Sequence, residues 1–205
     1  MVHAIILDMN LKLFSIISLL LFSIALITFA MPYGEGRYGE CKYGVSCTIS
    51  MTTFGTVDLP LNLASGAKYT IDKDEVAVTT DSPSGYSLTV SSTSATDNDM
   101  ISGSNTLPST AATSASPTTL PLKNWGYRVD GILGFGAGPT TTVTNASSSS
   151  LTFAGMPLSG SPQLIKSTSS PASSDITEFW YGVHADITQT AGIYTSTVIY
   201  TATAL

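Results

Sequence analysis

Several short segments in which apolar and polar residues alternate constrain the fold of this chain more than any other feature. Such alternation puts successive side chains on opposite faces of a strand, so that one face can be buried. In segment 124–129, Trp125, Tyr127 and Val129 are therefore expected on an inner face. In segment 177–187, the expected inner row is Phe179, Tyr181, Val183, Ala185 and Ile187. The pattern predicts an all-β protein.

Turn signals place further strands. Val76–Thr80 and Tyr86–Val90 flank the loop Asp81–Gly85, whose Ser, Pro and Gly residues predict a hairpin between them. Segment Val57–Leu63 also alternates, and its Pro60 predicts an edge strand or a bulge because proline cannot donate to a ladder.

A last strand is expected over Gly192–Ala204, with one apolar face and one threonine-rich face. Many short strands without an amphipathic helix predict an antiparallel β-sandwich, and an Ig-like Greek-key topology is its leading form. We assign it to residues 48–205. Long Ser/Thr-rich stretches, 91–120 and 134–174, are expected as loops with only short strands inside them, such as Leu151–Phe153, and a binding surface can lie there. Asn145 begins an Asn-Ala-Ser sequon, and its glycosylation is left open.

The N-terminus has the pattern of an export signal. Lys12 precedes a long apolar run from Leu13 to Ala30, which ends in small residues. We expect cleavage after Ala30, with translation starting at Met1 or at Met9. The alternative is an uncleaved helix that anchors the chain, because the run is long enough to span a bilayer. Residues 1–30 are thus a signal peptide or an N-terminal membrane anchor, and contact with a membrane is expected only in the second case.

Composition narrows the function classes. Charged residues make up 11% of the chain, against about 25% in ordinary soluble domains. Eight basic residues face fourteen acidic ones without a basic cluster, so nucleic-acid binding is not expected. A surface solvated by hydroxyl groups is typical of an extracellular wall protein, and we expect a secreted, surface-associated location.

Residues 31–47 form a separate segment in which Tyr-Gly recurs every five residues. We interpret it as a turn-rich stalk, since glycine after each tyrosine disfavours a helix. Cys41 and Cys47 are the two cysteines of the chain, and in an exported segment they are expected to form a local disulfide. A metal site is not expected, because no further Cys or His stands at ligand spacing.

No catalytic constellation is recognisable, so we expect neither an enzyme nor a cofactor. Ser65-Gly-Ala-Lys68 has the S-x-x-K spacing of penicillin-recognising enzymes, but no S-D-N or K-T-G element follows. The acidic runs 72–75 and 97–99 lack the full calcium-loop spacing, and both are expected as solvated turns.

The sharpest candidate for a binding site is the outward row of segment 177–187: Glu178, Trp180, His184 and Asp186. An exposed tryptophan flanked by hydrogen-bonding groups can hold a sugar face or a protein partner. The alternative is that Trp180 packs beneath one of the long loops, because tryptophan is mostly buried in folded proteins.

Two segments, Gly85–Val90 and Ala191–Thr203, resemble the two strand motifs of WxL-type surface domains of bacteria. The likeness runs from Val76 to the C-terminus, with Tyr86 and Tyr200 at the tryptophan places and Ala202 at that of the final leucine. The Tyr-Gly-Glu repeat is also similar to segments of small uncharacterised exported proteins of bacteria with reduced genomes. The resemblance implies a secreted β-sandwich held non-covalently at the cell wall.

We therefore expect a non-enzymatic surface module that binds a cell-wall glycan or another surface protein. The alternative is a structural subunit of a surface filament or layer that assembles by strand addition. Its donor would be Val57–Leu63 or the Tyr-Gly segment. The sequence leaves the oligomeric state open.

Overall fold

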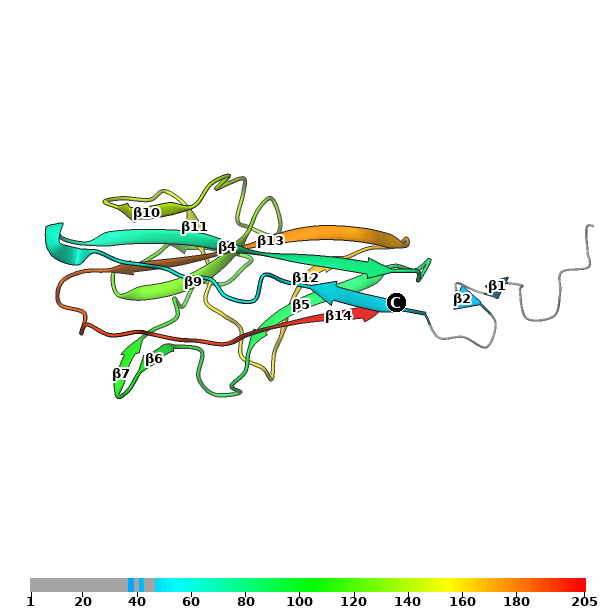
Figure 1. The fold of residues 1–205 in the computed structure, drawn as a ribbon, viewed down its shortest axis with the longest axis horizontal. Helices are drawn as coiled ribbons and strands as arrows, with labels where there is room; N and C mark the ends of the chain where they lie inside the picture. Colours follow the sequence, from blue (N-terminus) through cyan, green and yellow to red (C-terminus); the bar gives the residue numbers. More distant parts are fainter. Residues whose placement is uncertain (1–36, 39–40, 43–46) are drawn as a thin grey trace, which may run out of the picture. The chain divides into compact units, whose positions relative to one another are not determined.

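The computed structural model describes residues 37–38, 41–42 and 47–205 (Figure 1). The chain divides into two units, Met1–Ser46 and Cys47–Leu205. In the first unit, β1 (Arg37–Tyr38) pairs antiparallel with β2 (Cys41–Lys42). The apolar run 13–30 and both candidate start sites lie outside the described residues. So does the side chain of Cys41, and the Cys41–Cys47 disulfide stays a prediction. No helix within the described residues is long and apolar enough to cross a membrane.

The larger sheet of the second unit is antiparallel and is built around two long central strands. β4 pairs along one edge with β13, and β13 pairs in turn with β9. The other edge of β4 is shared by β10 and β3, which pair with opposite halves of the strand. The bounds are β3 (Ile49–Thr52), β4 (Lys68–Thr80), β9 (Asn124–Val129), β10 (Val143–Ala146) and β13 (Ala172–Ala185).

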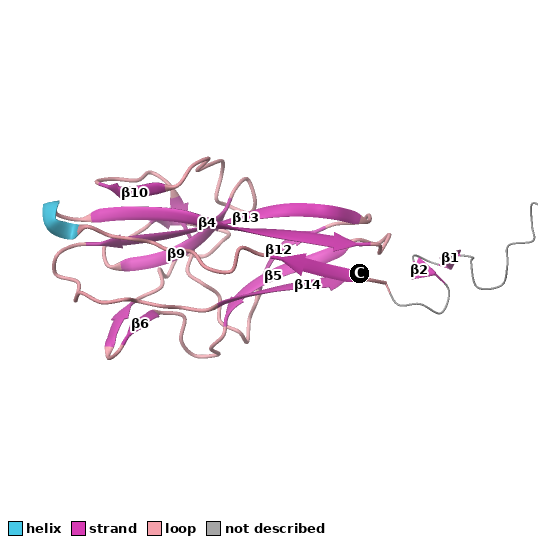
Figure 2. Cartoon of the chain, in the orientation of Figure 1, coloured by secondary structure: helices cyan, strands magenta, loops and turns pink. Residues whose placement is uncertain are grey.

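The smaller sheet has the order β12–β5–β14 and is also antiparallel. Its strands are β5 (Tyr86–Ser92), β12 (Gln163–Ser167) and β14 (Val198–Ala204). Two short pairs complete the strands: β6 (Met100–Ser102) with β7 (Asn105–Leu107), and β8 (Thr118–Thr119) with β11 (Thr152–Phe153). The remainder is loop apart from one 3-10 turn, η2 (Leu63–Ser65) (Figure 2).

Outside the loops, the described residues form strands and one 3-10 turn, so the all-β prediction is confirmed. The main core lies between the two sheets. Trp125, Tyr127 and Val129 are buried as the alternation predicted. The predicted inner row of β13 is also buried from Phe179 to Ala185. Ile187 is an exception and is 74% exposed, because β13 ends at Ala185 and a turn follows it.

The predicted hairpin between Val76–Thr80 and Tyr86–Val90 is wrong. Both segments are strands, but β4 belongs to the larger sheet and β5 to the smaller one. The two edges of β4 are already occupied by β13 and by β3 with β10, so β5 has no free edge there to pair with. Loop 81–85 instead carries the chain across the core, and the apolar faces of the two strands meet inside it.

The predicted strand Val57–Leu63 is also wrong. Its side chains keep the alternation, since Val57, Leu59 and Leu61 are half-buried against the main core. Among the described residues the segment has no ladder partner, because β10 holds the adjacent edge of β4. A side-chain bond fixes it instead: the Thr70 hydroxyl donates to the Pro60 carbonyl oxygen at 2.6 Å.

Two smaller predictions also need correction. The acidic run 72–75 is part of β4 and not a turn. The last strand begins at Val198 rather than Gly192, although Tyr194 still packs against the main core. The run 97–99 lies outside the strands, and the Asp97 carboxylate accepts the N–H of Asp99 there.

The chain enters and leaves the second unit at the same end. Ile49 in β3 pairs with Thr80, and Ala204 in β14 pairs with Tyr86, on either side of loop 81–85. We call this the proximal end (Figure 1). At the opposite, distal end, His184 pairs with Asn124, and the loop 186–197 leaves β13.

Candidate binding surface

The predicted binding row lies partly on the outer face of β13, which points away from the main core. Glu178, Trp180 and His184 stand at alternate positions on this face, and Asp186 follows the end of the strand. In register beside Trp180 lie Lys73 of β4 and Arg128 of β9. The sheet therefore brings three of the four predicted residues onto one face, flanked by two cations.

Trp180 is fully buried, at 0% exposure. It forms a second core cluster with Ile71, Leu120 and Phe153 on the outer side of the large sheet. The Lys73 ammonium lies 5.4 Å from the centre of the indole ring. The ring is thus closed to a ligand, and the alternative of a tryptophan covered by a loop describes the structure.

Two glycines leave room for the segment 153–155, which covers the outer face of the sheet. Gly182 of β13 and Gly126 of β9 are register partners on the outer face. A Cβ atom at Gly182 would lie 2.6 Å from ring atoms of Phe153, and one at Gly126 would lie 2.6 Å from the Ala154 carbonyl oxygen. Side chains at both positions would exclude the segment 153–155 from the sheet. The covering layer therefore depends on a glycine pair that is distant in sequence.

Arg128 is also buried under this layer, at 1% exposure. Its guanidinium donates to carbonyl oxygens of Phe135 and Gly136 at 3.0 Å and of Thr152 at 3.2 Å. Burial lowers the pKa of the guanidinium, and the nearby Asp130 carboxylate opposes that shift. Because arginine stays protonated in proteins, this is a buried cation held by main-chain oxygens.

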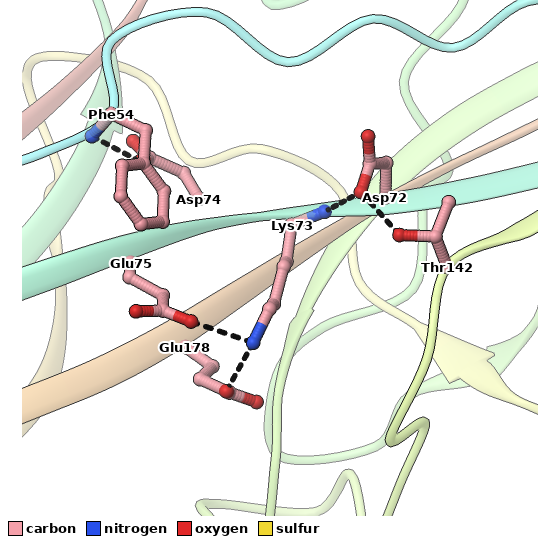
Figure 3. A network of polar contacts seen from close by, with 7 residues as sticks. All are labelled: Phe54, Asp72, Lys73, Asp74, Glu75, Thr142 and Glu178. Carbon is pink, nitrogen blue, oxygen red and sulfur yellow. Dashed lines mark hydrogen bonds and ion pairs between the residues drawn. The ribbon is translucent and has the colours of Figure 1, made fainter.

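The open rim of the face is a small ionic cluster on β4 and β13 (Figure 3). The Lys73 ammonium lies 2.7 Å from a carboxylate oxygen of Glu75 and 2.5 Å from one of Glu178. The hydrogen bond to Glu178, followed by that to Glu75, raises the pKa of Lys73. All three side chains are partly exposed, so solvent screens these pairs and each contributes little to stability.

His184 and Asp186 have structural partners. The His184 ring stacks on Tyr69 at 3.7 Å between centroids, and its Nδ1 lies 3.0 Å from the Leu120 carbonyl oxygen. Nδ1 must carry a proton there, because a carbonyl oxygen only accepts. The Asp186 carboxylate accepts the N–H and the hydroxyl of Thr188, and the hydroxyl bond lowers its pKa.

Asn145 of the predicted sequon lies in β10. Its side-chain oxygen accepts the N–H of Asn62 at 2.5 Å, and its own N–H donates to the Thr70 hydroxyl. The side chain thus helps to hold the unpaired segment that precedes β4. The glycosylation of Asn145 stays an open prediction.

Glu178 also borders a cavity of about 220 Å³ beside the end of β9. The other lining residues are Val129, Asp130, Ile132, Lys166, Ile176 and Thr177. Sequence reasoning predicted none of these six as a binding residue, although it did place Val129 on the inner face of its strand. Lys166 is the single basic residue of the Ser/Thr-rich stretch 134–174. That is the sequence signal from which a site at this cavity could have been predicted.

Lys166 takes part in a polar clamp between the two sheets. Its ammonium lies 2.6 Å from one carboxylate oxygen of Asp175 in β13, and the buried Tyr86 hydroxyl donates to the other at 2.8 Å. Desolvation raises the pKa of the Asp175 carboxyl, but the bonds from Lys166 and Tyr86 outweigh it and leave the pKa below its ordinary value. Burial, with the bond to Asp175, raises the pKa of Tyr86.

We expect Asp175→Asn to lower the free energy of unfolding at pH 7 by about 1–2 kcal/mol, because it removes the charge that both donors face. Because the pKa of the Asp175 carboxyl is lower in the folded protein than in the unfolded chain, where it is about 3.9, the ionised carboxylate stabilises the folded state above that pH. This stabilisation is lost as the pH falls through the folded-state pKa. The difference between wild type and variant should therefore shrink below about pH 4. Urea titrations at several pH values measure it, and a difference independent of pH would contradict the clamp.

The distal end exposes large apolar side chains. Ile187 and Ile193, both in loop 186–197, are 74% and 86% exposed, and Leu122 beside the start of β9 is 42% exposed. Single exposed apolar residues are ordinary, but these three lie on the two segments that adjoin the distal ends of β9 and β13. We call Leu122, Ile187 and Ile193 the distal apolar residues.

The chain matches no protein-family model, no curated protein and no solved structure. Its function has to be inferred from its own residues and their geometry.

Proposed function

We propose that this protein is an exported, non-enzymatic component of the cell surface, with an Ig-like Greek-key sandwich that acts as a wall-associated binding or adhesion module. Its apolar run 13–30 and its hydroxyl-rich, charge-poor composition support export. The partner would be a cell-wall glycan or another surface protein.

The distal apolar residues carry this proposal. A domain whose chain enters and leaves at the proximal end presents its opposite end to a partner, and exposed isoleucines there can be buried on contact. Tyr86 and Tyr200, which stand at the tryptophan places of WxL-type domains, do not present exposed rings to a ligand. Tyr86 is fully buried, and the Tyr200 hydroxyl forms a hydrogen bond with that of Tyr181 at 2.5 Å. Retention at the wall therefore has to use another surface, and the distal end is the best supported.

The test is binding of the protein to washed, isolated envelopes. Burial of an exposed isoleucine contributes about 1.5–3 kcal/mol, and every 1.4 kcal/mol is about tenfold in affinity. The double variant Ile187→Ser, Ile193→Ser should therefore bind about 100-fold more weakly or worse. Leu164→Ser is the matched control, because Leu164 is 48% exposed but lies on β12, away from the distal end. Equal loss in both variants, or no loss in either, would overturn the proposal.

A structural subunit that assembles by strand addition is the second candidate, and one observation favours it: the edge strand β14 carries no charge. The expected donor Val57–Leu63 is less suitable than it looked in sequence, since its apolar side chains already pack on their own domain.

A further inference from the structure

We propose that β14 pairs antiparallel with β14 of a second copy, across a two-fold axis at Thr201, so that two small sheets become one continuous sheet. This deepens the second candidate function by naming the partner and the register. It is separate from envelope binding, so a monomeric protein that still binds envelopes would overturn this inference alone.

The outer edge of β14 has main-chain N–H and C=O groups that can pair with another strand. The Leu205 N–H donates to the Gly85 carbonyl oxygen at 3.0 Å, which fixes the alternation along the strand. Thr201 and Thr203 share this orientation and direct their main-chain groups toward β5. The intervening residues direct theirs to the outside: Val198, Tyr200, Ala202 and Ala204. Across residues 47–205, no main-chain hydrogen bond reaches that edge.

This edge lacks the protection that natural sheets usually carry. Edge strands are commonly blocked by lysine, proline or a bulge, but β14 reads Val-Ile-Tyr-Thr-Ala-Thr-Ala and keeps a regular register with β5. Its neighbours β5 and β3 contain no charged residue either. On a chain with a net charge of −6, this uncharged side is where a second copy can approach without like-charge repulsion.

In one register, the side chains of β14 are complementary in size to those of β14 in the second copy. With the axis at Thr201, the large Val198 and Tyr200 stand opposite the small Ala204 and Ala202 of the other copy. Ile199, which is 40% exposed, stands opposite Thr203 on the outer face. Every outward main-chain group of β14 is paired in this register, and the interface closes on itself as a two-fold contact does.

The first experiment uses the full chain, extracted from expressing cells in mild detergent and sized by analytical ultracentrifugation over a range of concentrations. Ala202→Pro removes an outward N–H while sparing the bonds to β5, and Ala202→Ser keeps that N–H. We expect a dimer for wild type and Ala202→Ser. The Ala202→Pro dimer should be weaker by about 10- to 100-fold, because a hydrogen bond is lost from each copy.

A cysteine pair tests the register. At the axis, Thr201 and its counterpart would have Cα atoms about 4.5 Å apart, so Thr201→Cys should form a covalent dimer on mild oxidation. In Thr203→Cys the two positions lie about 14 Å apart, and no such dimer should form.

A monomeric wild type, or a dimer that Ala202→Pro leaves unchanged, would overturn the inference. Higher polymers that survive Ala202→Pro would also overturn it, and would point to donation of residues 31–47 to another edge. Circular dichroism of every variant shows whether the fold is retained.

Discussion

Replacing Trp180 with alanine is expected to lower the free energy of unfolding by about 3–5 kcal/mol, the usual cost of removing a fully buried tryptophan. The indole ring joins the outer face of β13 to Ile71 of β4, to Leu120 and to Phe153 of β11 in the covering layer. Its loss would leave a cavity between the sheet and those loops. Urea unfolding followed by circular dichroism measures the effect.

Trp180→Phe is the matched control. It keeps an aromatic ring in the second core cluster but leaves part of the volume empty, so a smaller loss of about 1–2 kcal/mol is expected. The indole N–H has no hydrogen-bond partner within the described residues, and removing it therefore costs no bond. If Trp180→Ala were as stable as wild type and yet failed to bind envelopes, the ring would be acting at the surface, contrary to its burial.

Local pattern was enough to predict much of the fold. The alternation in β9 and β13 identified both strands and their buried faces, because a sandwich core imposes that period directly on the sequence. The same pattern misled at Val57–Leu63, where alternate burial arises without a ladder. It also could not show whether loop 81–85 joins paired strands or crosses between sheets, since a turn of Ser, Pro and Gly serves either course.

The candidate site was harder to predict because it depends on contacts between distant segments. Period-two reasoning placed Glu178, Trp180 and His184 on an outward face, and they do lie there. Whether that face meets solvent depends on Gly126 and Gly182, which become neighbours only through the pairing of β9 with β13. The usual burial of tryptophan pointed to a Trp180 covered by a loop, but no local signal links the two glycines to Phe153. The identity of the covering segment and the burial of Arg128 could therefore not be derived from the sequence.

Arg128→Ala is expected to be comparably destabilising, at about 3–5 kcal/mol. The guanidinium donates to the carbonyl oxygens of Phe135, Gly136 and Thr152, and hydrogen bonds to a charged group contribute about 1.5–3 kcal/mol each without adding fully. Alanine would remove the guanidinium donors from these oxygens, of which that of Gly136 keeps the Gly131 N–H and that of Phe135 keeps the Thr152 hydroxyl. It would also leave the volume of the side chain empty.

Two further variants separate charge from shape. Arg128→Lys keeps a cation, but a single ammonium cannot reproduce the planar fork, so an intermediate loss of about 1–3 kcal/mol is expected. Arg128→Met fills much of the volume without donors. If Arg128→Met were as stable as wild type, the buried cation would contribute packing alone and the carbonyl bonds would carry no net free energy.

Hydrogen exchange shows where the effect of Arg128 is felt. Loop 131–137 closes with the Gly131 N–H donating to the Gly136 carbonyl oxygen, and the Arg128 guanidinium binds the same oxygen. Loss of the guanidinium should therefore speed exchange at Gly131 well before global unfolding, while amides of β5 keep their protection. Uniform acceleration across both sheets would mean that Arg128 supports the whole sandwich rather than its outer layer. Selective exchange would show that the covering layer is a separate unit, which Arg128 and the glycine pair hold on the sheet.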